Sequence, residues 1–490
     1  MSTVVFAGAG TTIADVAAIA RKDATVEIAP NVYERLTRAR AILDKAAASG
    51  QQIYGLNTGL GANLKTPVSD GIGNFQQQLV RGRGMGVGPP LPRELTRAVM
   101  ATRLSMLAVG GSGISPSVFN DLLTLLNKQI HPVMPSMGSI GAGDLVLLSA
   151  LAQSMIGEGR AEFRGQIYPS IRALAMAGIS PSKLGPKDGL SLLNASAVSV
   201  GQGALAAVDA AALLDFQRQA AALSFEALGG NPLILVPAIQ RARPATGQID
   251  EAEKLLTLLE GSGLFTSPSS IQDPLSLRCI PSIHGAFAAA LTTATDAIET
   301  ELNAAPDNPL IILDEDRVLS TGNFHTPALA LAFETLGLAI AQIASASAAR
   351  FIQLTGSARN GLPKYLTSAG GASAGFVPLQ KTVVALLAAM RHKANPVMLD
   401  FLPVSEGVED HATQTPLAVA KCAEMIVLWR QVVACEMLAG AQAVDLKPDH
   451  VCGRQTLQVH DFIREASSKL EEDRALGEDV SRLADMMATC

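Results

Sequence analysis

The sequence has little of several features that mark other classes of protein. Only 4% of its 490 residues are aromatic, which disfavours a β-sandwich and favours closely packed helices. It has no basic run, and the net charge is −6, so we expect no nucleic-acid partner. No apolar run approaches the roughly 20 residues that span a bilayer, and residues 1–26 lack a signal-peptide pattern. We therefore expect no membrane partner.

Cysteine is also scarce and forms no motif. The five cysteines are odd in number, widely scattered and without a Cys-x-x-Cys pair, which is typical of reduced thiols in a cytoplasmic protein. The seven histidines add no metal-ligand spacing, so no metal site is predicted. We expect His284, His325 and His411 to be hydrogen-bonded helix residues rather than metal ligands.

The amino-acid composition of the chain changes after its first third. Glycine and proline punctuate residues 1–185, which suits loops that approach a ligand or another chain. Residues 186–490 are rich in Ala and Leu at helical spacing, with apolar residues on more than one helix face. This predicts a mainly α fold with two domains, a loop-bearing domain (1–185) and a long-helix bundle (186–490). The clearest helical patterns cover residues 205–228, 284–302, 328–354, 383–392 and 415–438, followed by a charged tail helix at 461–485.

Three segments place a polar side chain within a distinctive short motif. Residues 54–61 read YGLNTGLG, residues 189–194 read GLSLLN, and residues 272–279 read QDPLSLRC. Each is similar to a motif of the histidine/phenylalanine ammonia-lyase family. The resemblance implies that Tyr54 is the catalytic base, that Asn194 lies in the active site, and that Arg278 binds the substrate carboxylate.

Further matches follow the family order along residues 50–415. Residues 307–310 (DNPL) and 322–325 (GNFH) resemble two more family motifs, and we expect Asn308 and Phe324 to bind substrate. Residues 409–411 (EDH) resemble the histidine-specific branch, in which the glutamate, here Glu409, contacts the substrate imidazole. The chain is identified as a member of this family, which implies an ammonia-lyase-like fold with a long central helical bundle.

One family motif is incomplete. Residues 138–145 read GSIGAGDL, whereas the family has Gly-Ser-(Val/Ile)-Gly-Ala-Ser-Gly-Asp-Leu, so the serine between Ala142 and Gly143 is missing. In the family, Ala-Ser-Gly cyclises and dehydrates into an electrophilic methylidene-imidazolone, whose methylene derives from the serine. Gly143 has no β-carbon from which to make it. We therefore expect no cofactor, and no methylidene-imidazolone.

Other departures concern the substrate. Leu275 stands where the family has a tyrosine near the amino group. Arg83 replaces a histidine that contacts imidazole in histidine ammonia-lyase, and Lys381 stands where the family usually has a small or apolar residue. Either cation would stabilise negative charge developing in the ring, while Glu409 binds a ring N–H. We assign Tyr54, Lys381 and Glu409 catalytic roles, and Arg83 a substrate-binding one.

These departures together predict a particular elimination. An ammonium substrate has N–H protons far more acidic than its β-proton, a difficulty that the imidazolone overcomes by alkylating the nitrogen. A quaternary trimethylammonium has no N–H and leaves as neutral trimethylamine. The sequence thus predicts a carbon–nitrogen lyase that converts a histidine-derived betaine, ergothioneine, to thiourocanate, with the pKa of Tyr54 lowered by a nearby Arg or Lys.

Alternatives stay open. An ammonia-lyase or aminomutase would need an imidazolone made from another residue, and Ser139 is the only nearby serine. A non-catalytic paralogue on the lyase scaffold is the other alternative, and hercynine competes with ergothioneine as the substrate. The resemblance also implies a homotetramer with shared active sites, in which Tyr54 and Glu409 come from different chains.

Overall fold

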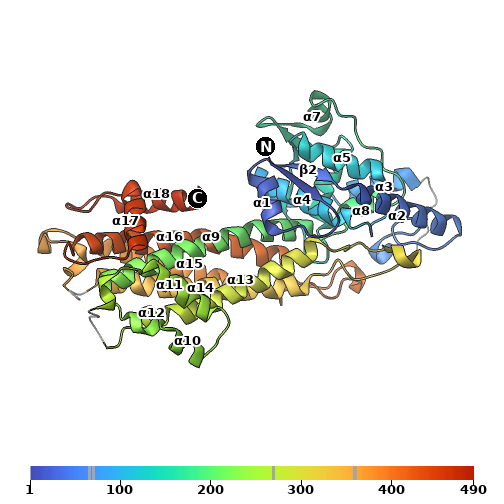
Figure 1. Ribbon diagram of the computed structural model, residues 1–490. Coiled ribbons are helices and arrows are strands. Elements are labelled where there is room, and N and C mark those ends of the chain that lie inside the picture. Colours follow the sequence, from blue (N-terminus) through green and yellow to red (C-terminus); the bar gives the residue numbers. More distant parts are fainter. Residues whose placement is uncertain (1, 65–67, 69–71, 267–270, 357–360, 490) are drawn as a thin grey trace. The chain divides into compact units, whose positions relative to one another are not determined.

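The computed structural model describes residues 2–64, 68, 72–266, 271–356 and 361–489 (Figure 1). It is predominantly helical, which confirms the mainly α prediction. Two compact units divide the chain, and each is described here by itself. The predicted division into residues 1–185 and 186–490 stays a prediction. Unit 1 comprises Met1–Val208, Ala294–Phe333 and Pro396–Ala420, and unit 2 comprises Asp209–Thr293, Glu334–Asn395 and Lys421–Cys490.

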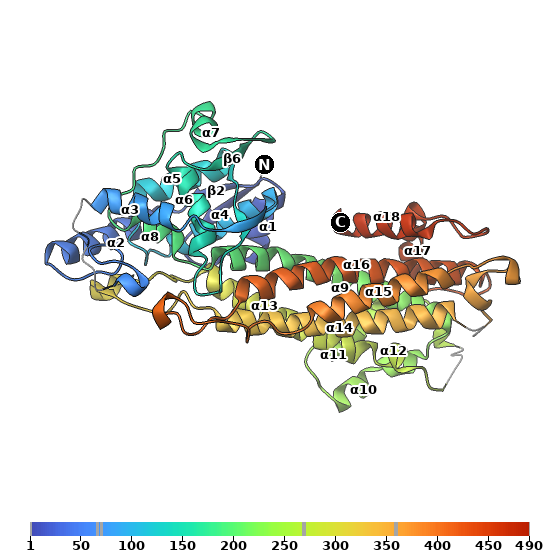
Figure 2. The ribbon, with the colours of Figure 1, turned by 180° about the vertical axis from the view of Figure 1, so that it is seen from behind.

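Unit 1 is built around one enclosed helix, α4 (Arg93–Ala108), which packs between α1 and α5 (Figure 2). Every residue from Leu95 to Ala108 is buried, because small and apolar side chains cover all faces of this helix. Two arginines, Arg97 and Arg103, are buried with them. The other helices that lie within unit 1 are α1 (Ile13–Arg21), α2 (Pro30–Ala48), α3 (Ile72–Gly82), α5 (Pro116–Asn127), α6 (Leu145–Met155), α7 (Ser170–Met176) and α8 (Asp188–Leu193).

All strands in the described part of the chain belong to unit 1 and form small sheets. Strands β1 and β2 pair in parallel, and the other pairings, β3–β5, β4–β6–β7 and β8–β9, are antiparallel. The strands are β1 (Thr3–Phe6), β2 (Thr25–Ile28), β3 (Val87–Pro90), β4 (Ile130–Pro132), β5 (Pro135–Met137), β6 (Arg160–Phe163), β7 (Gln166–Pro169), β8 (Leu310–Ile312) and β9 (Arg317–Leu319).

A small apolar cluster joins two distant segments of unit 1. Ile53 and Leu56, in the loop after α2, pack with Ile311 and Val318 of the β8–β9 hairpin. Leu43 of α2 completes the contact, and each of these side chains is at most 5% exposed. Burial of this apolar surface fixes the loop that carries Tyr54 beside the hairpin that follows Asn308.

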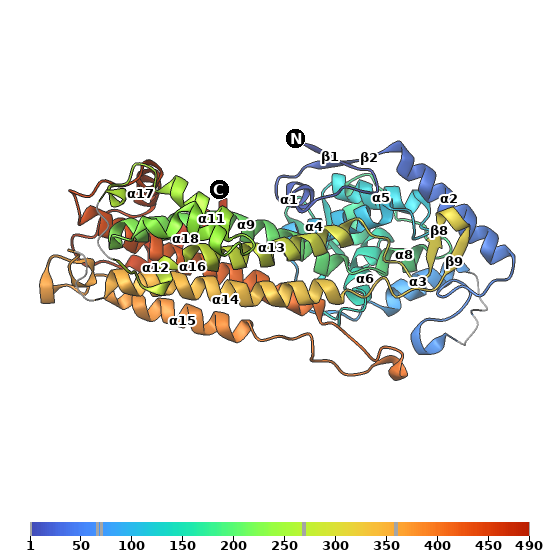
Figure 3. The same cartoon turned by 60° about the horizontal axis from the view of Figure 1, so that its bottom comes forward.

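Unit 2 is a bundle of long helices that run side by side (Figure 3). Glu436 of α16 lies at its centre, fully buried, and accepts hydrogen bonds from Ser224 of α9 and from Ser347 and Arg350 of α14. The helices α9 (Ala197–Leu228), α13 (Ile280–Leu302), α14 (Pro327–Thr355) and α16 (Thr415–Asp445) contribute residues to both units. Unit 2 alone contains α10 (Pro237–Ala242), α11 (Gln248–Leu258), α12 (Leu275–Arg278), α15 (Val377–Lys393), α17 (Arg454–Ala466) and α18 (Leu476–Thr489).

The predicted single tail helix is wrong, because the helix is interrupted between Ala466 and Leu476. Helix α17 ends at Ala466, and Ser467 takes an extended conformation. The Ser467 hydroxyl donates to Asp479 of α18 at 2.9 Å, and Arg474 donates to the same carboxylate. The tail is therefore two helices joined by a hydrogen-bonded turn.

Although no uninterrupted apolar run reaches the length of a membrane span, two helical stretches, residues 188–228 and 327–355, are long and apolar enough on average to span a bilayer. Within the protein, 72% and 56% of their most apolar windows are buried. Such burial is typical of core helices in soluble proteins, which pass the same test of length and composition.

Candidate active site

A cavity of about 860 Å³ opens in unit 1 and is lined by three segments far apart in the sequence. They lie within residues 51–64, 308–324 and 408–409. Tyr54, Asn308, Phe324 and Glu409, all predicted site residues, are among the lining residues. The volume suits a small-molecule ligand.

The loop that carries Tyr54 is held by its own side chains. The Asn57 amide accepts from the Ile53 N–H and donates to the Gln51 carbonyl, both at 2.8 Å. At the far end of the loop, the Gly61 N–H donates to the Tyr54 hydroxyl oxygen at 2.9 Å. The sequence did not identify Gly61 as a functional residue, although it lies in the quoted motif. A backbone donor here stabilises a Tyr54 phenolate.

The pKa of Tyr54 is raised, so the prediction that it is lowered is wrong for this chain. Burial, which disfavours the phenolate, is the largest cause, and the negative charge of Glu409 acts in the same direction. The Gly61 hydrogen bond and the positive charge of Arg83 lower the pKa, as expected for a cation, but they do not offset the burial. Arg83 itself is partly buried and is not among the residues that line the cavity.

Two asparagines are fixed to one another beside the cavity. Asn194 is buried at the carboxyl end of α8, and its Nδ2 donates to the Asn308 carbonyl at 2.9 Å. The Asn308 Oδ1 accepts from the Ser320 hydroxyl and the Thr321 N–H, both at 3.1 Å. The two predicted residues thus lie together, and the side-chain oxygen of Asn308 holds the chain after β9.

Glu409 reaches the cavity from a short irregular segment. Val404 and Glu409 form an isolated antiparallel bridge, and the Ser405 hydroxyl donates to the Glu409 carboxylate at 2.6 Å. Tyr54 and Glu409 line the same cavity of one chain. The expectation that these two residues come from different chains is therefore wrong.

The histidines of two motifs also meet. His325 Nε2 and His411 Nδ1 lie 2.8 Å apart and are hydrogen-bonded, as predicted. The prediction that both lie in helices is wrong, because they stand in the irregular segments before α14 and α16. His284 lies in α13, as predicted, but its Nε2 has no hydrogen-bond partner among the described residues. The hydroxyl groups of Thr326, which follows His325, and Thr415, at the start of α16, form a hydrogen bond at 3.0 Å. These contacts join the segment of Phe324 to the segment of Glu409.

The incomplete motif lies against the same residues. Gly143 has a φ of +83°, and a β-carbon placed on it would lie 2.8 Å from the Leu145 Cδ1, 3.6 Å from the Asn194 Oδ1 and 4.0 Å from the Phe324 Cβ. This position therefore lies beside Leu145 and faces two predicted site residues, Asn194 and Phe324. Because Gly143 has no β-carbon, the residues here do not fit a methylidene-imidazolone.

Ser139, the nearby serine that could otherwise form an imidazolone, makes hydrogen bonds that hold the loop. Its hydroxyl donates to the carboxylate of Asp144 at 2.7 Å. That carboxylate is fully buried and accepts from the Val198 and Ser199 N–H groups in the first turn of α9, at 2.9 and 3.0 Å. An anion at this position satisfies free N–H groups and interacts favourably with the helix dipole.

The two remaining predicted residues belong to unit 2. Arg278 ends the short helix α12 and borders a second cavity, of about 360 Å³, together with Arg243 and Ser282. Gln272, with its amide oxygen turned toward Arg278, accepts from both terminal guanidinium nitrogens. Lys381 is exposed on α15. Neither Arg278 nor Lys381 is among the residues that line the unit 1 cavity.

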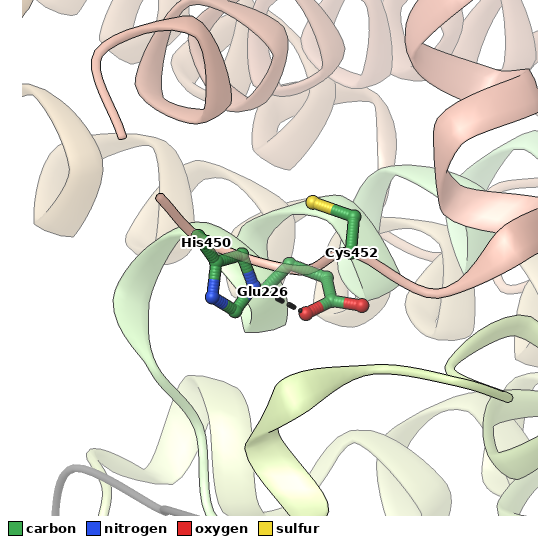
Figure 4. A group of neighbouring side chains, drawn as sticks. All are labelled: Glu226, His450 and Cys452. Atoms are coloured by element: carbon green, nitrogen blue, oxygen red, sulfur yellow. Dashed lines mark hydrogen bonds and ion pairs between the residues drawn. The ribbon is translucent and has the colours of Figure 1, made fainter. Parts of the chain in front are cut away.

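One group of side chains in the described residues has the chemistry of metal ligands (Figure 4). Ligand atoms of Glu226, His450 and Cys452 lie within 4.8 Å of one another. The Glu226 carboxylate, however, already accepts from His450 at 2.7 Å, from Ser262 at 2.7 Å and from the Gly453 N–H at 2.8 Å, and burial raises the pKa of the Cys452 thiol to about 12. The group is better explained as a hydrogen-bonded junction between α9 and the start of α17.

The matches to known proteins agree with this architecture. The model of the aromatic amino acid lyase family matches residues 11–465, and the chain belongs to that family. It is accordingly a carbon–nitrogen lyase, on the ammonia-lyase fold. It is 38% identical over 485 residues to a histidine ammonia-lyase of Treponema denticola, covering 98% of this chain and 96% of that protein.

Solved structures share the whole fold. Ergothionase from Treponema denticola, solved in complex with desmethyl-ergothioneine sulfonic acid, superposes with a TM-score of 0.95 at 32% identity, covering 100% of this chain and 99% of that one. Histidine ammonia-lyase from Trypanosoma cruzi gives 0.92 at 30% identity, with coverages of 99% and 93%. The predicted ammonia-lyase-like fold is thus confirmed.

Proposed function

We propose that this lyase eliminates trimethylamine from ergothioneine to give thiourocanate, without a methylidene-imidazolone. The observation that carries the proposal is Gly143, which has no β-carbon where the backbone faces Asn194 and Phe324. Tyr54 and Glu409 nevertheless still share the cavity. A site that keeps its base and its ring-binding carboxylate but has no electrophile suits a substrate that needs none. The similarity to ergothionase supports this choice.

The reaction is balanced without a co-reactant. The Tyr54 phenolate takes the β-proton, and the electrons of that C–H bond form the double bond between the α- and β-carbons. The bond between the α-carbon and nitrogen breaks with its electron pair, and neutral trimethylamine leaves. Tyr54 ends as the phenol and returns its proton to solvent before the next turnover.

The substrate itself favours ionisation of the base. The pKa of Tyr54 is raised in the free chain, mainly by burial. A trimethylammonium bound in the cavity places a permanent positive charge near this hydroxyl, which lowers its pKa. The ring of Phe324, which lines the same cavity, offers an aromatic face to that cation.

The remaining predicted residues divide between the two ends of the substrate. Glu409 accepts a hydrogen bond from the imidazole N–H, and Arg83 or Lys381 stabilises negative charge on the thione side of the ring. Arg278 and Asn194 hold the carboxylate, with Asn308 fixing Asn194 through their 2.9 Å bond. Hercynine lacks the sulfur, so it lacks the group that the cation binds.

We also propose a homotetramer in the cytoplasm, in which another chain supplies Arg278 and Lys381. Leu338, Val384 and Val427, on three long helices of unit 2, are more than 50% exposed in the single chain. Burying such surface between chains is favourable. Dissociating and reassembling a mixture of inactive Tyr54→Phe and Arg278→Met proteins should restore activity, because some mixed sites receive both native residues. No recovery would contradict shared sites.

The proposed activity is tested by supplying ergothioneine, hercynine and L-histidine separately to the purified protein. We expect trimethylamine and a new ultraviolet absorbance of thiourocanate from ergothioneine, and no ammonia from histidine. Trimethylamine from hercynine alone would assign the sulfur-free betaine. No turnover of any of the three would favour a non-catalytic paralogue.

Ammonia elimination from histidine is the second candidate, favoured by the names of the curated relatives. It requires an electrophile that the residues around Gly143 do not provide. Ammonia from histidine, abolished by Ser139→Ala together with an ultraviolet absorbance of the resting enzyme, would establish it.

A further inference from the structure

A buried arginine connects the enclosed helix of unit 1 to both site asparagines. Arg103 of α4 is fully buried, and its Nη2 donates to the Ser191 carbonyl of α8. The same nitrogen donates to the Asp307 carboxylate, at 3.1 Å to Oδ1 and 3.4 Å to Oδ2. Ser191 lies three residues before Asn194, and Asp307 directly precedes Asn308. One guanidinium group thus holds the two segments that carry these asparagines.

We infer that Arg103 is a positioning residue that sets the geometry of Asn194 and Asn308 through Ser191 and Asp307. The role of Asn194 in substrate binding rests on the proposed function, whereas the placement of the two segments does not.

Stability alone does not explain this ion pair. Both partners are fully buried, and well-packed apolar residues of similar volume are often as stabilising as a buried ion pair, or more so. In addition, Arg103 Nε and Nη1 have no hydrogen-bond partner within the described chain, which is costly in a buried site. The contacts that Arg103 does make are those that fix the two site segments.

A neighbouring cation supports the same segment. Lys187 precedes α8, is fully buried, and donates to the Ser112 carbonyl and, at 3.3 Å, to the Ser191 hydroxyl. Ser191 therefore receives one cation at its carbonyl and another at its hydroxyl. This fixes α8, and so Asn194 at its end, against the body of unit 1.

The chain offers a matched control. Arg97 lies on the same helix, is likewise buried, and donates to the Ile19 carbonyl at 2.9 and 2.8 Å. It also donates to the Leu126 carbonyl at 3.3 Å. None of these partners belongs to a segment that carries a predicted site residue. Removing Arg97 therefore breaks a comparable buried site without disturbing the asparagines.

The test compares the double variant Arg103→Met/Asp307→Leu with Arg97→Met in the full-length protein. The double variant replaces the ion pair by apolar side chains, so we expect it to keep a thermal midpoint near that of the wild type. Amide hydrogen exchange in residues 188–195 and 305–312 should increase at least roughly tenfold. With ergothioneine, kcat/KM should fall about 100-fold, because small displacements of positioning groups cost that much. Arg97→Met should lose stability but keep its exchange in these segments and its kcat/KM.

Three results would overturn the inference. The first is amide exchange in both segments of the double variant at the rate of the wild type. The second is a kcat/KM of the double variant equal to that of the wild type despite faster exchange. The third is that Arg97→Met shows the same increase in exchange and the same loss of kcat/KM. If the double variant does not fold, Asp307→Asn, which keeps the shape and removes the charge, is measured in its place. If the wild type does not turn over ergothioneine, the proposed function fails, whereas the exchange comparison still decides the role of Arg103.

Discussion

Replacing Tyr54 by phenylalanine isolates the contribution of one oxygen atom. The ring is kept, and the change removes the hydroxyl that accepts the Gly61 N–H at 2.9 Å. General base catalysis typically contributes about 100- to 10,000-fold, so we expect kcat on ergothioneine to fall by about three orders of magnitude. The lost hydrogen bond should lower the free energy of unfolding by only about 1 kcal/mol.

The pH dependence of the wild type gives a second, sharper signature. The phenolate is the active form, so the rate should rise with pH until Tyr54 is ionised. The ascending limb of the pH profile of kcat/KM reports the free enzyme, in which burial raises the pKa of Tyr54. The limb in kcat reports the complex, in which the trimethylammonium charge lowers that pKa. The limb in kcat should therefore lie at the lower pH, and Tyr54→Phe should remove both.

Tyr33→Phe is the matched control, because the Tyr33 hydroxyl also makes one side-chain hydrogen bond, to Asn120 at 3.3 Å. Its turnover should equal that of the wild type, as measured by trimethylamine release at several pH values. A Tyr54→Phe enzyme within about tenfold of the wild type would refute the assignment of the base. A limb in kcat at the same pH as the limb in kcat/KM, or above it, would refute the role given to the substrate charge.

The remaining predictions concern charge and covalent state. Glu409→Gln should lower kcat/KM about 10- to 100-fold, because a charge-assisted hydrogen bond is lost. It should also move the pH at which Tyr54 ionises to a lower value, because the negative charge of Glu409 raises the pKa of Tyr54. If that pH did not move, Glu409 would be too far from Tyr54 to act on it. Burial raises the pKa of Glu301 to about 7 from 4.5, so its contribution to stability is present below pH 4.5 and is lost as pH rises through 7. Denaturant titrations of Glu301→Gln should therefore show a gain in the free energy of unfolding of up to about 3 kcal/mol at pH 8 and no gain at pH 4. Equal effects at both pH values would contradict the explanation that burial raises the pKa of Glu301. Intact mass spectrometry should give the mass of the unmodified chain, whereas a mass lower by the water lost in both cyclisation and dehydration would show a methylidene-imidazolone.

Much of this molecule was predictable from local patterns. The long helices follow from Ala and Leu at helical spacing. The expected range 328–354 agrees with α14 within one residue at each end, 205–228 ends with α9, and 415–438 begins with α16. However, α9 already begins at Ala197, and α16 continues to Asp445. The tail was not predictable in this way, because its helical periodicity continues through the Ser467 turn, which a contact with Asp479 fixes.

The same distinction, between local patterns and contacts made only in the folded chain, applies to the site. Motifs identified Tyr54, Asn308 and Glu409 individually, but the pattern of one segment does not show how burial in the folded cavity changes the pKa of a side chain. That is why the direction for Tyr54 was wrong. Gly61 and Arg103 were missed for a related reason, because they act through a backbone N–H and through a contact between distant segments.

The loop of the incomplete motif is anchored on both sides of its tip. Ile140 and Gly141 carbonyls accept from the Gln414 N–H and the Thr413 hydroxyl, and the Asp144 N–H donates to the Ala195 carbonyl at 2.7 Å. Only two residues, Ala142 and Gly143, lie between these anchors, and Ala142 itself forms an isolated antiparallel bridge with His325. Because the anchors flank the tip, we expect a one-residue difference in length to be absorbed there, with the segments of Thr413 and Ala195 kept in place.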